Sequence, residues 1–373
     1  MSVLRPLSRV TLVSPYALSV FGGVQEQVLA MSRELSRRGL VVQVVAPDAR
    51  DHVAYESPAT FARFGTMVRL PANGSRAPLT LSGRAARAAA RAVADFGPDV
   101  VHFHEPFAPR VGYVIRRHHH YPAVATFHRS GEGPAVRLAA PLLRRWARDL
   151  DRVAAVSTQA ATTARASCGR DCDVLFNGFE MERFVEFPRE VATTTTLVVV
   201  GRLEARKGVA TAVAAVLHHN ATETVPWRLV VVGDGPARPT LEHAAQGDRL
   251  IEFVGAVSDE EKRRWLRRAD VVVAPATHGE SFGLVLLEAM ASETRVVASD
   301  IAGYRDAAGV HAVWFTPHDA LDLERAVVEA LRRRDPEILR RARDHAQHWS
   351  MSRLVDEYLT MYDDARRHFL ALG

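Results

Sequence analysis

Two glutamates eight residues apart, Glu280 and Glu288, could contact a polar ligand. They lie in the segment His278-Gly279-Glu280-Ser281-Phe282-Gly283-Leu284-Val285-Leu286-Leu287-Glu288. Eight residues make about two helical turns, but Ser281-Phe282-Gly283 is a poor helix interior. The pattern therefore favours a loop that turns into a helix, with Glu280 in a cleft and the amides of Phe282 and Gly283 free to donate hydrogen bonds. Glu288 would lie inside the helix and need a polar partner, for which ribose hydroxyls would serve; an amphipathic helix with two surface glutamates is the alternative.

Two cations with the spacing to bind one diphosphate precede this segment. In Gly201-Arg202-Leu203-Glu204-Ala205-Arg206-Lys207-Gly208, which follows a predicted strand, Arg202 offers a planar fork and Lys207 a point charge. Of 48 basic residues only Lys207 and Lys262 are lysines, so lysine is kept where a compact ammonium is needed. Solvated charges on a turn are the alternative. The earlier pair Gly22-Gly23 would let helix amides approach a phosphate, although a tight turn explains such a pair equally well.

Three histidines at predicted strand ends allow a different chemistry. His102 and His104 share one strand and His128 ends another, so they could ligate a metal as in metal-dependent hydrolases. The other strand-end candidate ligand, Asp300, lies in the other half of the chain. We therefore expect these histidines to pack or to face the cleft.

Composition limits the class of protein. The 373 residues are 47% hydrophobic with a formal net charge of +5, which suits two domains and anionic partners. No stretch reaches the ~18 apolar residues of a membrane helix, so a cytoplasmic location is expected by default. The basic residues are dispersed and lack interleaved aromatics, which disfavours nucleic-acid binding.

Short β-branched segments alternate with helical patterns along the whole chain, which predicts parallel sheets with helical crossovers. The expected strands are 10–14, 41–46, 100–104, 123–128 and 153–157 in the first half, and 197–201, 229–233, 251–255, 271–275, 296–300 and 313–315 in the second. The segment 177–196 is the expected linker, and 350–370 is predicted to be one long amphipathic helix. The predicted domains are residues 1–185 and 186–349, with 350–373 crossing back onto the first.

Together these elements resemble a known family. The E-x7-E element, the G-R-x4-K-G element and the glycine pair are similar to those of the retaining glycosyltransferases of family 4. The segments Pro15-Tyr16, Gly22-Gly23-Val24-Gln25, Asn73-Gly74-Ser75, His102-Phe103-His104-Glu105-Pro106, Thr126-Phe127-His128 and Phe176-Asn177-Gly178 most resemble the actinobacterial phosphatidylinositol mannosyltransferases. The resemblance implies the α/β GT-B fold: two Rossmann-like domains facing across a deep interdomain cleft.

The resemblance also implies a metal-independent retaining hexosyltransferase that uses a nucleotide-sugar co-substrate, GDP-mannose above others, and no further cofactor. His128 would lie beside the anomeric centre, Arg202 and Lys207 would neutralise the leaving diphosphate, and Glu280 would bind sugar hydroxyls. The implied donor-binding set is Gly22, Gly23, Arg202, Lys207, Val257, Asp259, Lys262, Glu280, Ser281, Phe282, Gly283, Leu284 and Glu288. The implied acceptor-binding set is Tyr16, Gln25, Asn73, Ser75 and Arg76.

Recognition of the base and of the acceptor is less sharply defined. Asp259 would accept hydrogen bonds from guanine and Lys262 would approach its carbonyl, yet Ser258-x-x-Glu261 is a capping box that suits any base. In the family, an arginine follows a little after the serine of the Asn73-Gly74-Ser75 segment. In this chain the matching position is Pro78, and the arginine stands at Arg76 instead. A nucleotide-sugar epimerase or a UDP-sugar-dependent transferase on the same fold remains an alternative.

Two basic helical faces are candidates for contact with an anionic membrane. Arg84, Arg87 and Arg91 form one stripe, and this is the surface expected to bind the inner membrane face. The other combines Arg144, Arg145 and Arg148 with Leu138, Leu142, Leu143 and Trp146. Ordinary solvated helix faces explain either pattern as well.

Overall fold

The computed structural model describes residues 5–19, 23–47, 57–65, 68–72, 75–79, 82–107, 111–118, 120–128, 134–189, 193–280, 283–333 and 335–372. The chain divides into two compact units. Unit 1 comprises Met1–Phe179 and Met351–Gly373, and unit 2 comprises Glu180–Ser350. The chain therefore passes between the units after residues 179 and 350, where the sequence placed the domain boundaries after 185 and 349.

Unit 1 is built on a seven-stranded sheet of parallel strands in the order β3-β2-β1-β6-β7-β8-β9. The strands contain mostly β-branched and other apolar residues, as strands covered on both faces require. They are β1 (Arg9–Val13), β2 (Val41–Pro47), β3 (Thr60–Phe64), β6 (Val100–His104), β7 (Ala123–Phe127), β8 (Arg152–Ala155) and β9 (Asp173–Val174). A separate antiparallel hairpin joins β4 (Val68–Ala72) to β5 (Ser75–Leu79).

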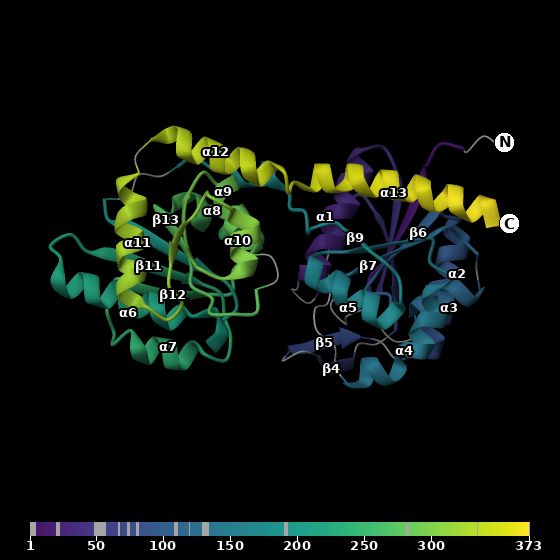
Figure 1. Cartoon of the computed structure of the whole chain (residues 1–373), viewed down its shortest axis with the longest axis horizontal. Helices are drawn as coiled ribbons and strands as arrows, with labels where there is room; N and C mark the ends of the chain where they lie inside the picture. The colour runs from purple at the N-terminus through teal and green to yellow at the C-terminus, as the bar shows by residue number, and fades with distance from the viewer. Residues whose placement is uncertain are drawn as a thin grey trace. The chain divides into compact units, whose positions relative to one another are not determined.

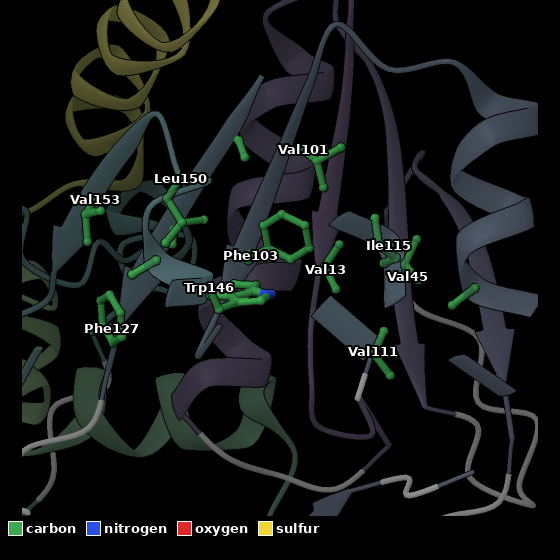
Figure 2. Packing of buried hydrophobic residues seen from close by; sticks show 14 of the residues in the cluster. Val13, Val45, Val101, Phe103, Val111, Ile115, Phe127, Trp146, Leu150 and Val153 are labelled. Atoms are coloured by element: carbon green, nitrogen blue, oxygen red, sulfur yellow. The ribbon is translucent and has the colours of Figure 1, made fainter. Parts of the chain in front are cut away.

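Helices cover both faces of this sheet. One face carries α2 (Gly83–Phe96), α3 (Val111–His118), α4 (Pro134–Ala147) and α5 (Thr158–Cys168). Figure 2 shows its core, where the Trp146 indole lies edge-on to the Phe103 ring at a centroid distance of 6.0 Å. The opposite face carries α1 (Gly23–Arg37) and the last helix, α13 (Met351–Leu372), which lie side by side (Figure 1).

Unit 2 has a six-stranded parallel sheet in the order β12-β11-β10-β13-β14-β15. This is the order 3-2-1-4-5-6 of the Rossmann fold. The strands are β10 (Thr195–Val200), β11 (Trp227–Val232), β12 (Ile251–Gly255), β13 (Val271–Ala274), β14 (Arg295–Ser299) and β15 (Val313–Phe315). The helices are α6 (Val209–Thr222), α7 (Arg238–Ala244), α8 (Asp259–Arg268), α9 (Leu284–Ala291), α10 (Ala302–Ala308), α11 (Ala320–Arg332) and α12 (Pro336–Gln347), with 3-10 turns η1 (Met181–Phe184) and η2 (Ala205–Lys207).

The prediction of two Rossmann-like α/β domains is confirmed, and every predicted strand lies within two residues of an observed one. The predictions did not include β3, β9 or the β4–β5 hairpin. The strand β9 has only two residues, and β3, β4 and β5 have arginine or proline at interior positions. The final helix runs over Met351–Leu372, close to the predicted 350–370.

Candidate active site

In unit 2 the strand order reverses between β10 and β13, and ligands of open α/β sheets bind at the carboxyl ends of strands at such a point. The loop after β10 contains the two phosphate-binding candidates, and the loop after β13 contains Glu280. Gly208 holds these loops together: a Cβ on it would lie 1.9 Å from the carbonyl oxygen of Pro275, and its φ is +65°. Both the close approach and the left-handed backbone require glycine. The fold thus brings two motifs 70 residues apart in sequence to one place.

Two cationic side chains contact Glu280 at this place. Its Oε1 atom lies 2.7 Å from Lys207 Nζ and 2.7 Å from Arg206 Nη1. Arg206 also contacts Glu204 at 3.0 Å, and Arg202 contacts Glu204 at 3.3 Å with a side chain 57% exposed. Lys207, Arg202 and Glu280 therefore form one cluster, as their motifs suggested. Arg206 is an addition to it, for which the sequence offered only its place in the motif.

The second lysine forms a parallel arrangement with the second glutamate. Lys262 Nζ lies 2.9 Å from Glu288 Oε1 and 3.0 Å from Asp259 Oδ1. The Lys262 and Glu288 side chains are only 11% and 7% exposed, so this pair is buried. Burial alone would raise the pKa of Asp259, but Lys262, Arg263 and Arg183 outweigh it and hold that pKa below its usual range. The need of Glu288 for a polar partner was expected, and in the structure Lys262 is one such partner; the expected contact with ribose hydroxyls stays a prediction.

The predicted change from loop to helix after Glu280 is confirmed. Helix α9 begins at Leu284, and its N-cap, Gly283, has a φ of +71°. A Cβ at Gly283 would lie 2.5 Å from the ring of Tyr304, so glycine is required there by the neighbouring side chain as well. Ser281 and Phe282 lie outside the described residues, and Leu284 and Val257 are half-buried. Ser258 caps α8 by accepting a hydrogen bond from Glu261 N at 3.2 Å, as the capping box predicted.

Candidate residues of unit 1 surround the start of α1. Gly23 opens this helix, and a Cβ there would meet no atom within 4 Å among the described residues. Its φ is not positive, so neither packing nor backbone conformation requires this glycine. Gln25 is buried and donates a hydrogen bond to Ala17 O at 3.4 Å, and the Tyr16 N–H contacts Ser14 Oγ at 3.2 Å. Gly22 and Asn73 lie outside the described residues; Ser75 and Arg76 lie on β5, and their side chains are outside the described part of the chain.

The three histidines form a stack at the carboxyl ends of β6 and β7, which we call the histidine stack (His102, His104 and His128). The rings of His102 and His104 are 4.4 Å apart, and those of His104 and His128 are 5.2 Å apart. Burial lowers the pKa of His128 to about 3 and that of His102 also to about 3, so both are neutral at physiological pH. The pKa of His104 is held well below its usual range by burial and by the other two rings.

The contacts of this stack do not suit a metal site. Both ring nitrogens of His102 are hydrogen-bonded to hydroxyl groups, Nδ1 to Tyr362 and Nε2 to Thr126, each at 2.7 Å. The nitrogens of His104 and His128 face each other at 2.9 Å. The described residues contain no group of three or more histidine, cysteine or acidic side chains placed to hold a metal ion. The alternative of a histidine-ligated hydrolase therefore has no support in these contacts.

Glu105 positions His128 and was not among the predicted site residues. Its Oε1 atom accepts a hydrogen bond from the backbone N–H of His128 at 2.5 Å, and its own N–H is bonded to Thr126 O at 2.8 Å. Its φ is +47°, a strained value for a residue with a side chain. Strain of this kind is characteristic of functional sites. The sequence signals were its place directly after a buried strand and within the segment His102-Phe103-His104-Glu105-Pro106, but no role was inferred for it.

The two basic faces of unit 1 differ from each other. On α2 the residues Arg84, Arg87 and Arg91 are all exposed, while the alanines between them are mostly buried. Arg144 and Arg145 of α4 and Arg148, just after its end, are exposed, and Leu142 is 66% exposed. Trp146, however, is only 8% exposed and packs on Phe103 and Phe107. The expectation that Trp146 contributes to a membrane face is therefore wrong, because this indole fills the core.

The fold and this site define the class of protein: a two-unit Rossmann-like enzyme with a cluster of cationic and acidic side chains where the strand order of unit 2 reverses. Residues 21–183 match the family model described as Glycosyltransferase Family 4, and residues 194–333 match the model for glycosyl transferases group 1. The chain belongs to glycosyltransferase family 4 and is a hexosyltransferase.

Three similar proteins illustrate this relationship. The phosphatidyl-myo-inositol mannosyltransferase of Propionibacterium freudenreichii is 32% identical over 97% of this chain and 96% of its own length. The protein of that name from Mycobacterium tuberculosis is 35% identical over 80% of this chain and 79% of its own. The crystal structure of a glycosyltransferase from Rickettsia africae has a TM-score of 0.75 at 14% identity, covering 97% of this chain and 99% of that one. None of the helices in the described residues is both long and apolar enough to cross a membrane.

Proposed function

We propose that the protein transfers mannose from GDP-mannose to a hydroxyl of phosphatidylinositol, with retention of the anomeric configuration. One observation supports the donor side above all: each of the two lysines contacts one of the two glutamates of the E-x7-E element, at 2.7 and 2.9 Å. In a chain with 46 arginines, two ammonium groups beside these glutamates support binding of a diphosphate and a ribose here. The names of the relatives support mannose and phosphatidylinositol.

The chemistry follows from these charges. The bond between the anomeric carbon and the phosphate oxygen breaks, the acceptor oxygen bonds to that carbon, and the acceptor proton passes to the leaving phosphate. The Lys207 ammonium and the Arg202 guanidinium stabilise the negative charge on the leaving diphosphate, which is the main catalytic effect. Glu280, already in contact with Lys207, orients that ammonium and binds sugar hydroxyls. In this proposal His128 contacts the sugar, and Tyr16 and Gln25 contact the acceptor.

A transfer assay tests this function. The protein is incubated with radiolabelled GDP-mannose and phosphatidylinositol vesicles, and both lipid-extracted label and released GDP are measured. We expect both to require the acceptor, and Lys207→Ala to lower turnover at least a hundredfold. Arg249→Ala, an exposed arginine of the same unit, is the control and should leave turnover unchanged. An isomerised sugar nucleotide without transfer would instead identify an epimerase, and turnover only with UDP- or ADP-sugars would reject GDP-mannose.

We also propose that the exposed arginine stripe of α2 (Arg84, Arg87 and Arg91) holds the protein at an anionic membrane surface. Three exposed guanidinium groups on one helix face can each contact a lipid phosphate. Cosedimentation with vesicles should require anionic lipid and weaken with salt, and replacing the three arginines by glutamine should abolish it. The matched triple substitution of Arg144, Arg145 and Arg148 should retain binding; the opposite result would move the contact to α4.

A further inference from the structure

We propose that His104 fixes the imidazole of His128 in the tautomer with its proton on Nδ1, so that His128 donates a hydrogen bond to a substrate oxygen and accepts no proton. The inference rests on the proposed function only for the identity of that substrate. The tautomer itself is a property of the protein alone. His104 is accordingly a positioning residue, acting through His128.

The geometry links the two rings directly. His104 ends β6 and His128 follows β7, the neighbouring strand, so both leave the sheet at the same edge. The Nδ1 atom of His104 lies 2.9 Å from the Nε2 atom of His128. At this distance one nitrogen must donate and the other accept, because two N–H groups or two lone pairs would repel each other. The position of a single proton therefore decides the tautomer of both rings.

The surroundings of His104 decide where that proton lies. The residue is 1% exposed, and its Nε2 atom is buried without a hydrogen-bond partner in the described part of the chain. With a proton on Nε2, His104 would bury an N–H group that no acceptor satisfies, and such orphaned donors are the rarer kind of defect in protein interiors. With the proton on Nδ1, the N–H is satisfied by His128 and only a lone pair is left bare. The second arrangement is therefore preferred.

The neighbouring ring cannot relieve His104. Both nitrogens of His102 are occupied by the hydroxyls of Tyr362 and Thr126, and Thr126 Oγ1 lies 2.8 Å from Tyr358 OH. Tyr362 donates to the sulfur of Met31, which can only accept. If each hydroxyl passes its proton along this chain, Tyr358 donates to Thr126, Thr126 donates to His102, and His102 donates to Tyr362. Every proton of this chain then has an acceptor, and no acceptor is left for a proton on His104 Nε2.

The consequence for His128 follows at once. Its Nε2 accepts from His104, so the proton of the neutral ring resides on Nδ1. Nδ1 has no hydrogen-bond partner among the described residues and is not one of the fully buried unpaired atoms, so it can donate to a ligand. Glu105 holds the backbone amide of His128 at 2.5 Å, which fixes the ring relative to the sheet. The side chain thus presents a fixed N–H donor, suited to a sugar hydroxyl or a leaving phosphate oxygen and unable to deprotonate an acceptor hydroxyl.

The tautomer can be measured without any substrate. In protein labelled with ¹⁵N-histidine, long-range proton–nitrogen correlation distinguishes protonated from bare ring nitrogens, and the His128→Gln variant identifies the His128 signals. We expect a protonated Nδ1 and a bare Nε2 in the unmodified chain at neutral pH. A protonated Nε2 on His128 would overturn the inference. A protonated Nδ1 in a protein that transfers no mannose would sink the proposed function and leave the tautomer standing.

Substitutions at His104 test whether this residue sets the tautomer of His128. His104→Leu removes the donor, whereas His104→Asn keeps an N–H near the position of Nδ1. In the leucine variant we expect His128 to lose its fixed tautomer and kcat to fall by about tenfold or more, with KM for the donor changed far less, because a mis-set tautomer impairs chemistry more than binding. The asparagine variant should restore both the tautomer and most of kcat. His120→Leu, an exposed histidine, is the control. Retention of the Nδ1 proton in a folded His104→Leu protein would refute the role of His104.

Discussion

The buried Lys262–Glu288 pair gives the most sharply defined prediction for stability. In Lys262→Met the apolar stem is kept and the ammonium removed, which leaves the Glu288 carboxylate buried without this partner. The side chains are 11% and 7% exposed, so solvent screens little of the loss. Breaking a buried ion pair by removing one partner costs about 3 to 5 kcal/mol. We expect the lower end, about 3 kcal/mol, because Asp259, the other partner of Lys262, is 37% exposed and can be solvated when the ammonium is gone.

For a unit of this size the loss corresponds to a fall in Tm of roughly 6 to 12 °C. Urea unfolding followed by tryptophan fluorescence measures it, because Trp227, Trp265, Trp314 and Trp349 all lie in unit 2. Replacing both partners, as Lys262→Met with Glu288→Leu, should recover most of the stability, since apolar side chains of similar volume substitute well for a buried pair.

A control on the same helix separates burial from charge. Arg264 and Glu260 form an ion pair of 2.6 Å on α8, with side chains 47% and 57% exposed. Arg264→Met should cost less than about 1 kcal/mol, as exposed pairs do. If Lys262→Met costs no more than Arg264→Met, or if the double replacement is less stable than Lys262→Met alone, the reasoning from burial is refuted.

Four further predictions concern two glycines, acid and a lysine. Gly23→Ala should leave Tm within about 2 °C of the unmodified protein yet raise KM for the donor, because only a ligand would meet the new Cβ; an unchanged KM would argue against donor contact there. Gly208→Ala should be strongly destabilising in the same thermal scan, since its Cβ would lie 1.9 Å from a carbonyl oxygen. The histidine stack should make the free energy of unfolding fall as pH drops from about 6.5 towards 3. In this range the histidines of the unfolded chain bind protons, whereas the buried rings of His102 and His128, with pKa values of about 3, stay neutral. Urea midpoints between pH 7.5 and 4.5 check this, and the same dependence of the midpoint on pH in a His102→Gln variant would contradict it. Lys207→Arg should lower kcat despite the retained charge, because the guanidinium cannot occupy the place of a compact ammonium beside Glu280, and a variant as fast as the unmodified enzyme would show that charge alone suffices.

Much of the fold could be predicted because its strands are simple. Buried parallel strands such as β13, and most of β11, consist of consecutive apolar residues, and the strand limits follow from the glycines and charges around them. The strand β9 has only two residues, Asp173 and Val174, and is held by its pairing with β8, so no local pattern marks it. In such elements the tertiary partner decides the structure rather than local sequence.

The sequence predicted which residues of each motif belong to the site, but not which of them contact each other. Arg202, Lys207, Glu280 and Glu288 were each singled out by residue type and spacing. Which lysine meets which glutamate depends on the order of β10 and β13 in the sheet, and this is not encoded in either motif. Arg206 provides the clearest example, because its contact with Glu280 joins two loops through a pairing between residues 74 apart.

The histidine stack shows a second limit of prediction from the sequence. The sequence placed His102, His104 and His128 at strand ends, and that is where they lie. Tyr362, which bonds His102 Nδ1, and Tyr358, which bonds the hydroxyl of Thr126, both come from α13, more than 200 residues away along the chain. The local sequence around the histidines does not show that these hydroxyls lie beside them, and for that reason a metal site could be considered from the sequence.

The return of α13 to unit 1 has a consequence for synthesis on the ribosome. Residues 1–179 emerge first, but the sheet face formed by Val10, Leu12 and Val100 is covered by Tyr358 and Tyr362 only after residue 351 has been made. At elongation rates of about 5 to 20 residues per second that interval lasts roughly 9 to 34 s. Unit 2, a single continuous stretch, can complete its fold during this time, while the part of this face that α13 covers is still open. A nascent chain of this protein therefore presents chaperones with a long-lived target, and a message truncated before codon 351 would yield one complete unit joined to one that can never close.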